Sequence, residues 1–328
     1  MAREGAIRST VVIPNYNGIA YIKNCLDSLL KEQEKTSFKV IVVDNHSTDG
    51  SKEVVIQDYP SVKLIAFDEN TGFCKAVNAG IEASDTEYVI LLNNDTTVEK
   101  GFVSELEKVM DQKPKAFSAG SKMVDMKNPE VIDDAGDFYC ALGWAFARGT
   151  GKLANNYTDV VEVFSACAGA AIYRRSVFEE IGLFDELHFA YLEDLDIGYR
   201  AKIFGYKNYF APASVVCHKG SAASGSRHNA FKVDLSSRNS VYVIYKNMPL
   251  IQQLLNLPFF LVGYLVKWLF FVRKGLGGKY AKGVFGGIKR NFGKEAKRHK
   301  VKFHFKNLKY YLIIQWELWK NVFLRICY

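Results

Sequence analysis

Short apolar runs alternate with amphipathic segments along the first hundred residues. Four runs rich in Val, Ile and Leu have the length and composition of buried β-strands: residues 9–13, 38–44, 62–67 and 87–95. The segments between them have helical spacing of apolar residues or begin with turn residues and continue as helices. This alternation predicts an α/β fold with a mostly parallel sheet flanked by helices, because right-handed crossovers return each strand to the same sheet.

Polar clusters follow each of these predicted strands. They are PNYNG at 14–18, DNHSTDG at 44–50, NTGF at 70–73 and NND at 93–95. Open α/β sheets bind ligands outside the carboxyl ends of their strands. We therefore expect the four clusters to converge on one cleft.

The chain changes character near Leu250. Residues 254–272 are almost wholly apolar, and residues 308–328 are rich in aromatic side chains. Pro258 and Lys267 interrupt the first stretch, and its 15 residues from Pro258 onward would extend about 22 Å as a helix, against about 30 Å for a bilayer core. We therefore expect this helix to lie in the plane of a membrane surface, and a spanning helix that includes residues before Pro258 is a less favoured alternative. A further alternative is that the C-terminal helices pack on each other or form a dimer.

Composition and charge point to a compartment and a partner. The 328 residues are 48% hydrophobic, which is enough for a large core. Six scattered cysteines form no CxxC pair, and no secretory signal is visible, so we expect a reducing, cytoplasmic location. Residues 273–309 hold 13 Lys or Arg and one acid, whereas the whole chain has a net charge of +8, so the remainder is mildly acidic. Such a segment suits a polyanionic partner, either an anionic membrane surface or a nucleic acid.

Two strand ends carry residue types suited to a nucleotide and a metal. Asp44 ends a buried strand, where a carboxylate can accept hydrogen bonds from a base or ribose, although a neighbour such as Ser47 could simply cap a helix. The oxygens of Asn93, Asn94 and Asp95 suit Mg²⁺ or Mn²⁺ beside a diphosphate, and a polar turn would have the same composition. The chain has neither GxGxxG nor a Walker loop, which argues against an NAD oxidoreductase or a P-loop NTPase.

The stretch FAYLEDLDIGYR at 189–200 crowds three carboxylates, Glu193, Asp194 and Asp196, beside apolar side chains. Neighbouring acids and apolar surroundings both raise the pKa of a carboxylate, which suits a general base. An acid-rich first helical turn would also satisfy the helix dipole. On a helix the three acids point in different directions, and Asp196 has Arg200 four residues later as an ion-pair partner.

Six motifs occur in order: TVVIPNYNG, VIVVDNHSTDGS, NTGFCKAVNAG, YVILLNNDTTV, GLFDELHFAYLEDLDIGYR, and HKGSAASG with a later RN. Together they closely resemble glycosyltransferase family 2, nucleotide-sugar enzymes of the GT-A fold, and most of all its bacterial rhamnosyltransferase-like members. The resemblance covers about residues 8–247. It implies a GT-A catalytic domain at 1–248 and leaves 249–328 as a basic, aromatic helical region that contacts a membrane surface or another copy of the chain.

The resemblance also implies roles for individual residues. Those expected to bind the nucleotide are Pro14, Tyr16 and Asn17 around the base, Asp44 at the pyrimidine with Asn45 and Ser47 beside it, Gly72, Phe73 and Asn78 in a lining loop, Asn94 in the metal motif, and Arg238 of the RN pair. Asp95 matches the last acid of a DxD-type metal motif whose first acid is here Asn93, and His218 stands where a late histidine can reach the metal, Mg²⁺ or Mn²⁺. Asp194 matches the catalytic base.

The function that follows is an inverting, metal-dependent sugar transfer at the inner face of the cell membrane. The donor expected first is dTDP-L-rhamnose, with a UDP-hexose or UDP-HexNAc as the alternative, and the acceptor is a lipid-linked saccharide. The segment KGSAASGSRHN at 219–229 is rich in Gly and Ser, which predicts a mobile loop that closes over the donor. Two other classes stay open: a nucleic-acid-binding protein that uses 273–309, against which the acidic body argues, and a non-catalytic scaffold.

Overall fold

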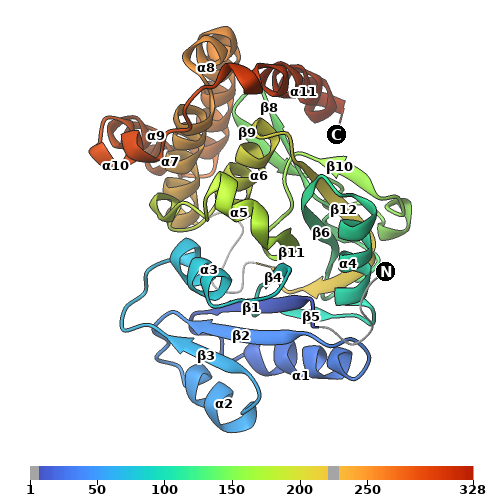
Figure 1. The fold of residues 1–328 in the computed structure, drawn as a ribbon. Coiled ribbons are helices and arrows are strands. Elements are labelled where there is room, and N and C mark those ends of the chain that lie inside the picture. Colours follow the sequence, from blue (N-terminus) through green and yellow to red (C-terminus); the bar gives the residue numbers. More distant parts are fainter. Residues whose placement is uncertain (1–6, 221–228, 328) are drawn as a thin grey trace.

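Four parallel strands form one half of a large central sheet in the computed structural model, which describes residues 7–220 and 229–327 (Figure 1). They are β1 (Ser9–Asn15), β2 (Lys39–Asp44), β3 (Lys63–Ala66) and β4 (Tyr88–Leu92). Helices α1 (Ile22–Gln33), α2 (Ser51–Asp58) and α3 (Phe73–Glu82) connect them in chain order. Strand β1 lies between β2 and β4, and β3 pairs with β2 at the outer edge, so the predicted alternation is confirmed.

The second half of the sheet joins the first through an antiparallel strand. Strand β11 (Ala170–Arg174) is antiparallel to both β4 and β6 (Ala116–Asp125), and β12 (Lys207–His218) is parallel to β6. Three short strands complete this half: β5 (Thr96–Val98), β7 (Ile132–Asp134) and β10 (Val161–Val163). The fold is α/β with a helix-flanked central sheet, as expected. Strands β1, β2, β3, β4, β6 and β12 run in one direction, and β11 enters between β4 and β6 in the opposite direction.

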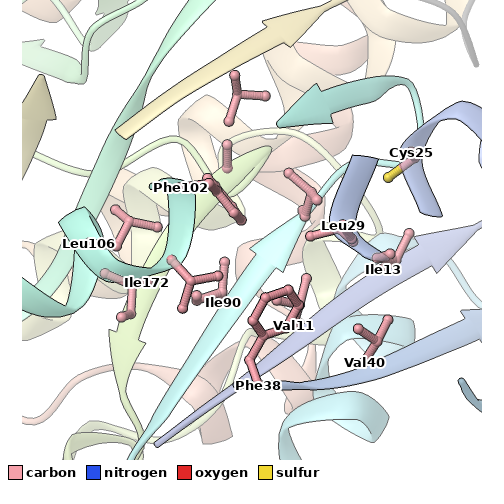
Figure 2. Close-up of a cluster of buried hydrophobic side chains, with 14 of the residues drawn as sticks. Val11, Ile13, Cys25, Leu29, Phe38, Val40, Ile90, Phe102, Leu106 and Ile172 are labelled. Carbon is pink, nitrogen blue, oxygen red and sulfur yellow. The ribbon is translucent and has the colours of Figure 1, made fainter. Parts of the chain in front are cut away.

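Helices cover both faces of the sheet (Figure 1). Helices α1 and α4 (Phe102–Gln112) pack on one face, and α3, α5 (Arg175–Ile181) and α6 (Glu193–Ile203) pack on the other. Because side chains alternate along a strand, Val11 and Ile13 enter the first layer, shown in Figure 2, whereas Val12 enters the second. A separate hairpin joins β8 (Asp137–Cys140) to β9 (Trp144–Ala147). The 3₁₀ turns are Ala154–Asn156, Glu186–His188 and Phe305–Asn307.

The C-terminal helices pack on the α/β region and on one another. They are α7 (Ala230–Asn247), α8 (Leu250–Arg273), α9 (Gly277–Asn291), α10 (Lys294–His299) and α11 (Leu308–Cys327). Helix α9 lies against α7, and α11 contacts β8 and α6. One buried cluster contains Leu195 of α6 together with Phe260 of α8 and Ile314 of α11. Residues on both sides of the predicted boundary at 248 and 249 therefore share a core, and the division into two domains stays a prediction.

Helix α8 is continuous through Pro258, so the expectation of a short interrupted helix is wrong. Its 24 residues extend about 36 Å, enough for the roughly 30 Å core of a bilayer. Within the described residues, α8 alone is long and apolar enough to cross a membrane, judged by length and composition only. Many large apolar side chains on α8, α9 and α11 and at the C-cap of α9 are exposed, among them Leu250, Ile251, Leu254, Leu261, Phe285, Phe292, Leu312, Trp316 and Phe323. We call these the exposed C-terminal apolar side chains.

Candidate active site

Asn15 connects the ends of three strands in the predicted cleft. Parallel pairing places Asn15 of β1 beside Asp44 of β2. Asn15 Nδ2 donates to Asp44 Oδ2 at 2.8 Å, and Asn15 Oδ1 accepts from Nδ2 of Asn94, just after β4, at 2.7 Å. Asp44 is fully buried, and its Oδ1 accepts from the Ser47 N–H at 2.9 Å. The strand ends do converge. Our reasoning from sequence missed Asn15 as their centre, although it stands within PNYNG.

The first loop rests on this network. Pro14 is the penultimate residue of β1, and Asn17 has a left-handed φ of 50°, which Asn tolerates better than most residues. The Ser47 hydroxyl accepts from the Asn17 N–H at 3.0 Å, and Asn17 Oδ1 accepts from the Thr48 N–H at 2.9 Å. Tyr16 is 42% exposed. Asn17 is exposed as well, so a ligand can reach both residues of this loop.

Asn45 attaches the third polar cluster to the second. Its Nδ2 donates to Asn70 Oδ1 at 3.0 Å and to the Gly72 carbonyl oxygen at 3.1 Å. Gly72 has a φ of 86° and packs so closely on Phe189 that a Cβ would lie 2.5 Å from its ring. Phe73 begins α3 directly after this contact. The loop expected to line the nucleotide therefore contacts the segment that carries the crowded carboxylates.

Two predicted nucleotide ligands outside the strand-end network, Asn78 and Arg238, also have partners within the protein. Asn78 Nδ2 donates to the Phe184 carbonyl oxygen at 2.8 Å, and its Oδ1 accepts from the Phe184 N–H at 3.0 Å. Arg238 Nη2 donates to Asp234 Oδ2 at 2.6 Å. Asn78 thus joins α3 to the segment before α6, and nucleotide contacts by either side chain stay predictions.

Asp95 and His218 face each other, as the metal hypothesis requires. Strand β5, which follows Asp95, pairs with the end of β12, and His218 Nε2 lies 3.4 Å from Asp95 Oδ1. Nδ1 of the same ring lies 2.6 Å from Asp133 Oδ2. Although burial favours the neutral ring, hydrogen bonds to Asp133 and Asp95 raise the pKa of His218 to about 9. The predicted donor-closing loop begins just after His218, but residues 221–228 lie outside the described residues.

Asp95 and His218 offer an oxygen and a nitrogen ligand that fit a divalent cation also bound by a diphosphate. Within residues 7–220 and 229–327, no group of three His, Cys, Asp or Glu side chains could hold a metal ion. A cation of the Mg²⁺ type bound to a nucleotide needs only one or two protein ligands, since phosphate and water oxygens complete its shell. Asp95 Oδ1 and His218 Nε2 are close enough to share one ion, and the ion would displace the Nε2 proton that the raised pKa of His218 keeps on the ring in its absence. Asp133 holds the other ring nitrogen, the arrangement that orients metal-binding histidines in general.

Asp196 belongs to a buried ion-pair network. Its Oδ2 lies 3.0 Å from Arg200 Nη2 and 2.8 Å from Lys246 Nζ, and its Oδ1 accepts from Asn247 Nδ2 at 2.8 Å. Although burial opposes ionisation, Lys246 and Arg200 lower the pKa of Asp196 to about 2. A carboxylate so stabilised is a poor base. The expected pairing with Arg200 is confirmed, and Asp196 is removed from the candidate bases.

Glu193 and Asp194 begin helix α6. Burial and the charge of Asp194 raise the pKa of Glu193 to about 8, and Glu193 Oε2 is buried with no hydrogen-bond partner in the described part of the chain. Burial also raises the pKa of Asp194, against the hydrogen bond that its Oδ1 accepts from the Leu195 N–H at 2.7 Å. At neutral pH Glu193 is mostly protonated. The charge of Asp194 is one cause of the raised pKa of Glu193, and the ionised carboxylate is the form that a base requires.

Asp134 and Asp137 are two further acids that interact electrostatically with Asp194. Burial raises the pKa of Asp134 to about 7 and that of Asp137 well above its ordinary value, and the charge of Asp194 contributes to both rises. Asp134 Oδ1 accepts from the Gly136 N–H at 2.7 Å. Reasoning from sequence missed these residues. The signal was present, because VIDDAGD places three acids within five positions, nearly as densely as the ED motif, which has three within four.

The family model named Glycosyl transferase family 2 matches residues 10–182, which is more than half of the chain. The matched region holds the strand ends that bear Asn15, Asp44 and Asp95. The chain belongs to this family and is a glycosyltransferase by class.

Known proteins agree with this assignment. The chain is similar to the N-acetylglucosaminyl-diphospho-decaprenol L-rhamnosyltransferase of Mycobacterium tuberculosis, with 27% identity over 265 residues that cover 70% of this chain and 84% of that protein. Among solved structures, GalNAc-T7 with UDP, GalNAc and Mn²⁺ has a TM-score of 0.59 at 18% identity and covers 74% of this chain, which spans 48% of that one. The mannosyltransferase PcManGT from Pyrobaculum calidifontis has a TM-score of 0.53 at 17% identity, with 95% and 84% covered. These two likenesses establish the GT-A fold alone.

Proposed function

We propose that the protein is an inverting, metal-dependent glycosyltransferase that moves L-rhamnose from dTDP-L-rhamnose to a lipid-linked saccharide of a cell-surface polysaccharide. The observation that carries the proposal is the convergence of the Asn15–Asp44 pair, the Asp95–His218 pair and the acids around Asp194 at the carboxyl ends of the strands. The choice of sugar and acceptor is supported by the name of the M. tuberculosis relative, of which the match covers 84%.

In this proposal the strand-end network holds the nucleotide. The exposed ring of Tyr16 stacks on the base, and Asp44 recognises the pyrimidine. Because Asp44 is fully buried, that contact requires the segment at Tyr16 and Asn17 to shift when the donor enters. Asp95 and His218 would hold the cation, which when bound neutralises charge on the diphosphate.

Asp194 is the proposed base for the acceptor. Its carboxylate takes the proton from the acceptor hydroxyl as the hydroxyl oxygen bonds to the anomeric carbon. The bond from that carbon to the diphosphate oxygen breaks on the opposite face, the nucleoside diphosphate leaves with the electron pair, and the configuration inverts. The raised pKa of Asp194 supports this role, because it strengthens the carboxylate as a proton acceptor.

The C-terminal region is proposed to bind an anionic membrane surface on the cytoplasmic side. The exposed C-terminal apolar side chains supply a surface that enters the interface, and the 13 basic residues of 273–309 supply attraction to anionic lipids. A lipid-linked acceptor would then be presented at the surface where the enzyme lies.

A thermal-melt screen of nucleotide sugars with Mn²⁺ or EDTA tests the donor. We expect dTDP-L-rhamnose with Mn²⁺ to raise Tm by about 3–5 °C when present at a hundredfold excess over its Kd, since such binding stabilises the fold by about 2.7 kcal/mol. EDTA should remove most of the shift. Stabilisation by UDP-sugars and not by dTDP-sugars would mean that the donor is a UDP-sugar and not dTDP-L-rhamnose. No shift of Tm with any nucleotide sugar would contradict the proposed function.

Vesicle co-sedimentation tests the membrane surface. We expect binding to phosphatidylglycerol-containing vesicles, and Lys294→Gln with Lys297→Gln should weaken it by about 30-fold, since each basic residue near the surface contributes about 1 kcal/mol. Both lysines are exposed, and Lys31→Gln with Lys35→Gln is the control with the same charge change on the α/β region. Equal loss in the control, a preference for duplex DNA, or a dimer in light scattering that binds no vesicle would contradict the proposal.

A further inference from the structure

We propose that Arg290, on helix α9 of the C-terminal region, is a positioning residue that holds the segment 187–192 and thereby aligns Asp194 with residues 70–73, which we call the donor loop. The inference rests on the proposed sugar transfer, because it assigns Asp194 as the base. It concerns a residue outside the region that matches the family model, which ends at residue 182. We call Leu187 to Leu192 the base-side loop.

The base-side loop has an unusual backbone. Phe189, Tyr191 and Leu192 all have positive φ, at 61°, 69° and 66°, a conformation that residues other than glycine rarely adopt. Such a segment persists only when its surroundings fix it. Leu192 directly precedes Glu193 and Asp194 at the start of α6, so the geometry of the loop sets the direction from which these carboxylates enter the site.

Asn239 makes three hydrogen bonds that fix the base-side loop. Its Nδ2 lies 2.9 Å from the carbonyl oxygens of His188 and Ala190 and 2.8 Å from that of Tyr191. Three acceptors of the strained loop thus converge on one amide nitrogen. Asn239 is fully buried, so no water can replace it without rearrangement.

Arg290 fixes Asn239 and the loop together. Arg290 Nη1 donates to Asn239 Oδ1 at 3.1 Å and to the Leu187 carbonyl oxygen at 2.6 Å. A guanidinium only donates, so it requires the oxygen of the Asn239 amide to face α9 and the nitrogen to face the loop. The guanidinium also lies 5.7 Å from the centre of the Tyr242 ring, which holds it in place.

The opposite side of the base-side loop meets the donor loop. The Phe189 carbonyl oxygen accepts from the Cys74 N–H at 3.2 Å, and the Phe189 ring packs on Gly72, where a Cβ would not fit. Gly72 is in turn bound by Asn45, beside Asp44. A continuous series of contacts therefore runs from Arg290 through the loop to the strand-end network, and a displaced loop would misalign base and donor.

The kinetic test compares Arg290→Ala with Lys289→Ala, which removes the same charge from the exposed neighbouring position. We expect Arg290→Ala to lower kcat per folded enzyme by about 100-fold, the cost of a misplacement near 1 Å, with the donor KM changed by less than about threefold. Millimolar guanidinium should restore part of the lost kcat in Arg290→Ala only. Arg290→Gln, which keeps most of the volume, serves if alanine reduces the folded fraction.

Hydrogen exchange supplies a readout that does not depend on activity. In Arg290→Ala, amides of 187–192 and the Cys74 amide should exchange at least about tenfold faster, whereas β1 and β2 should be unchanged. A wild-type kcat in Arg290→Ala, or a uniform rise of exchange over the whole chain, would overturn the inference. A wild-type enzyme that transfers no sugar overturns the proposed function instead, and the exchange pattern then still decides whether Arg290 holds the loop.

Discussion

Asp194→Asn should lower kcat for sugar transfer by about 10³-fold, within the range of about 10²–10⁴ that a general base contributes. Asn keeps the size of the side chain and the oxygen that accepts from the Leu195 N–H. It cannot take the acceptor proton. The measurement is single-turnover transfer at saturating donor, where the chemical step is separated from donor binding and product release.

The same variant should melt no lower than the wild type. Burial raises the pKa of Asp194, so the folded state holds the proton more tightly than the unfolded chain, and ionisation costs stability as the pH rises above the unfolded value. Removing the charge at pH 7.5 therefore relieves a cost. A melting curve equal to or above that of the wild type excludes unfolding as the reason for lost activity.

Glu193→Gln distinguishes the two neighbouring acids. The pKa of Glu193 is raised to about 8, so the side chain is mostly neutral at pH 7, and an amide changes little there. We expect Glu193→Gln to retain kcat within about tenfold at pH 7, less than the loss of a general base. If instead Glu193→Gln loses 10³-fold and Asp194→Asn does not, the roles of the two residues are exchanged.

The sequence predicted the strands and helices whose burial can be inferred from their own apolar residues. Continuous Val and Ile runs gave β1 and β2, because strands buried on both faces are apolar throughout. Strand β11, AAIYR, is also mostly apolar, but its antiparallel pairing with β4 and β6 depends on partners distant in the sequence and cannot be inferred from its own residues. Pro258 shows the opposite failure. Proline usually breaks or kinks a helix, but α8 continues through Pro258. Two residues earlier, Asn256 donates a hydrogen bond to Gln315 and so joins α8 to α11.

The candidate site likewise contains residues that the sequence predicted and residues that it did not. Asp44, Asp95 and Asp194 stand out because each acid adjoins an apolar run or lies in a dense polar cluster. Asn15 was missed because its importance comes from a contact 29 residues away, and Arg290 because its contact with Leu187 spans 103 residues. A polar residue whose role is to hydrogen-bond another polar residue of the protein cannot be recognised from the residues that surround it in the sequence. The three-dimensional arrangement reveals them.

Asp95→Asn should remove the metal dependence of nucleotide binding and lower kcat by about 10²–10³-fold, since loss of several kcal/mol of charge stabilisation corresponds to this factor. Asp95 is buried and faces His218 Nε2, so no other carboxylate can take its place without rearrangement. The direct measurement is Mn²⁺ titration by electron paramagnetic resonance, with and without dTDP, which reports the ion independently of turnover.

Two further variants serve as a comparison and a control for the Mn²⁺ affinity of Asp95→Asn. Asp133→Asn leaves Asp95 and His218 in place but weakens the contact that orients the imidazole, so Mn²⁺ affinity should fall by about 10–100-fold and not vanish. Asp85→Asn is the matched control, because this exposed carboxylate pairs with Lys39 at the opposite end of β2 from Asp44 and should leave Mn²⁺ binding unchanged. Unaltered Mn²⁺ affinity in Asp95→Asn would exclude the Asp95–His218 pair as the site. The diphosphate charge would then have to be balanced by cationic side chains, of which Arg238 is the first to replace.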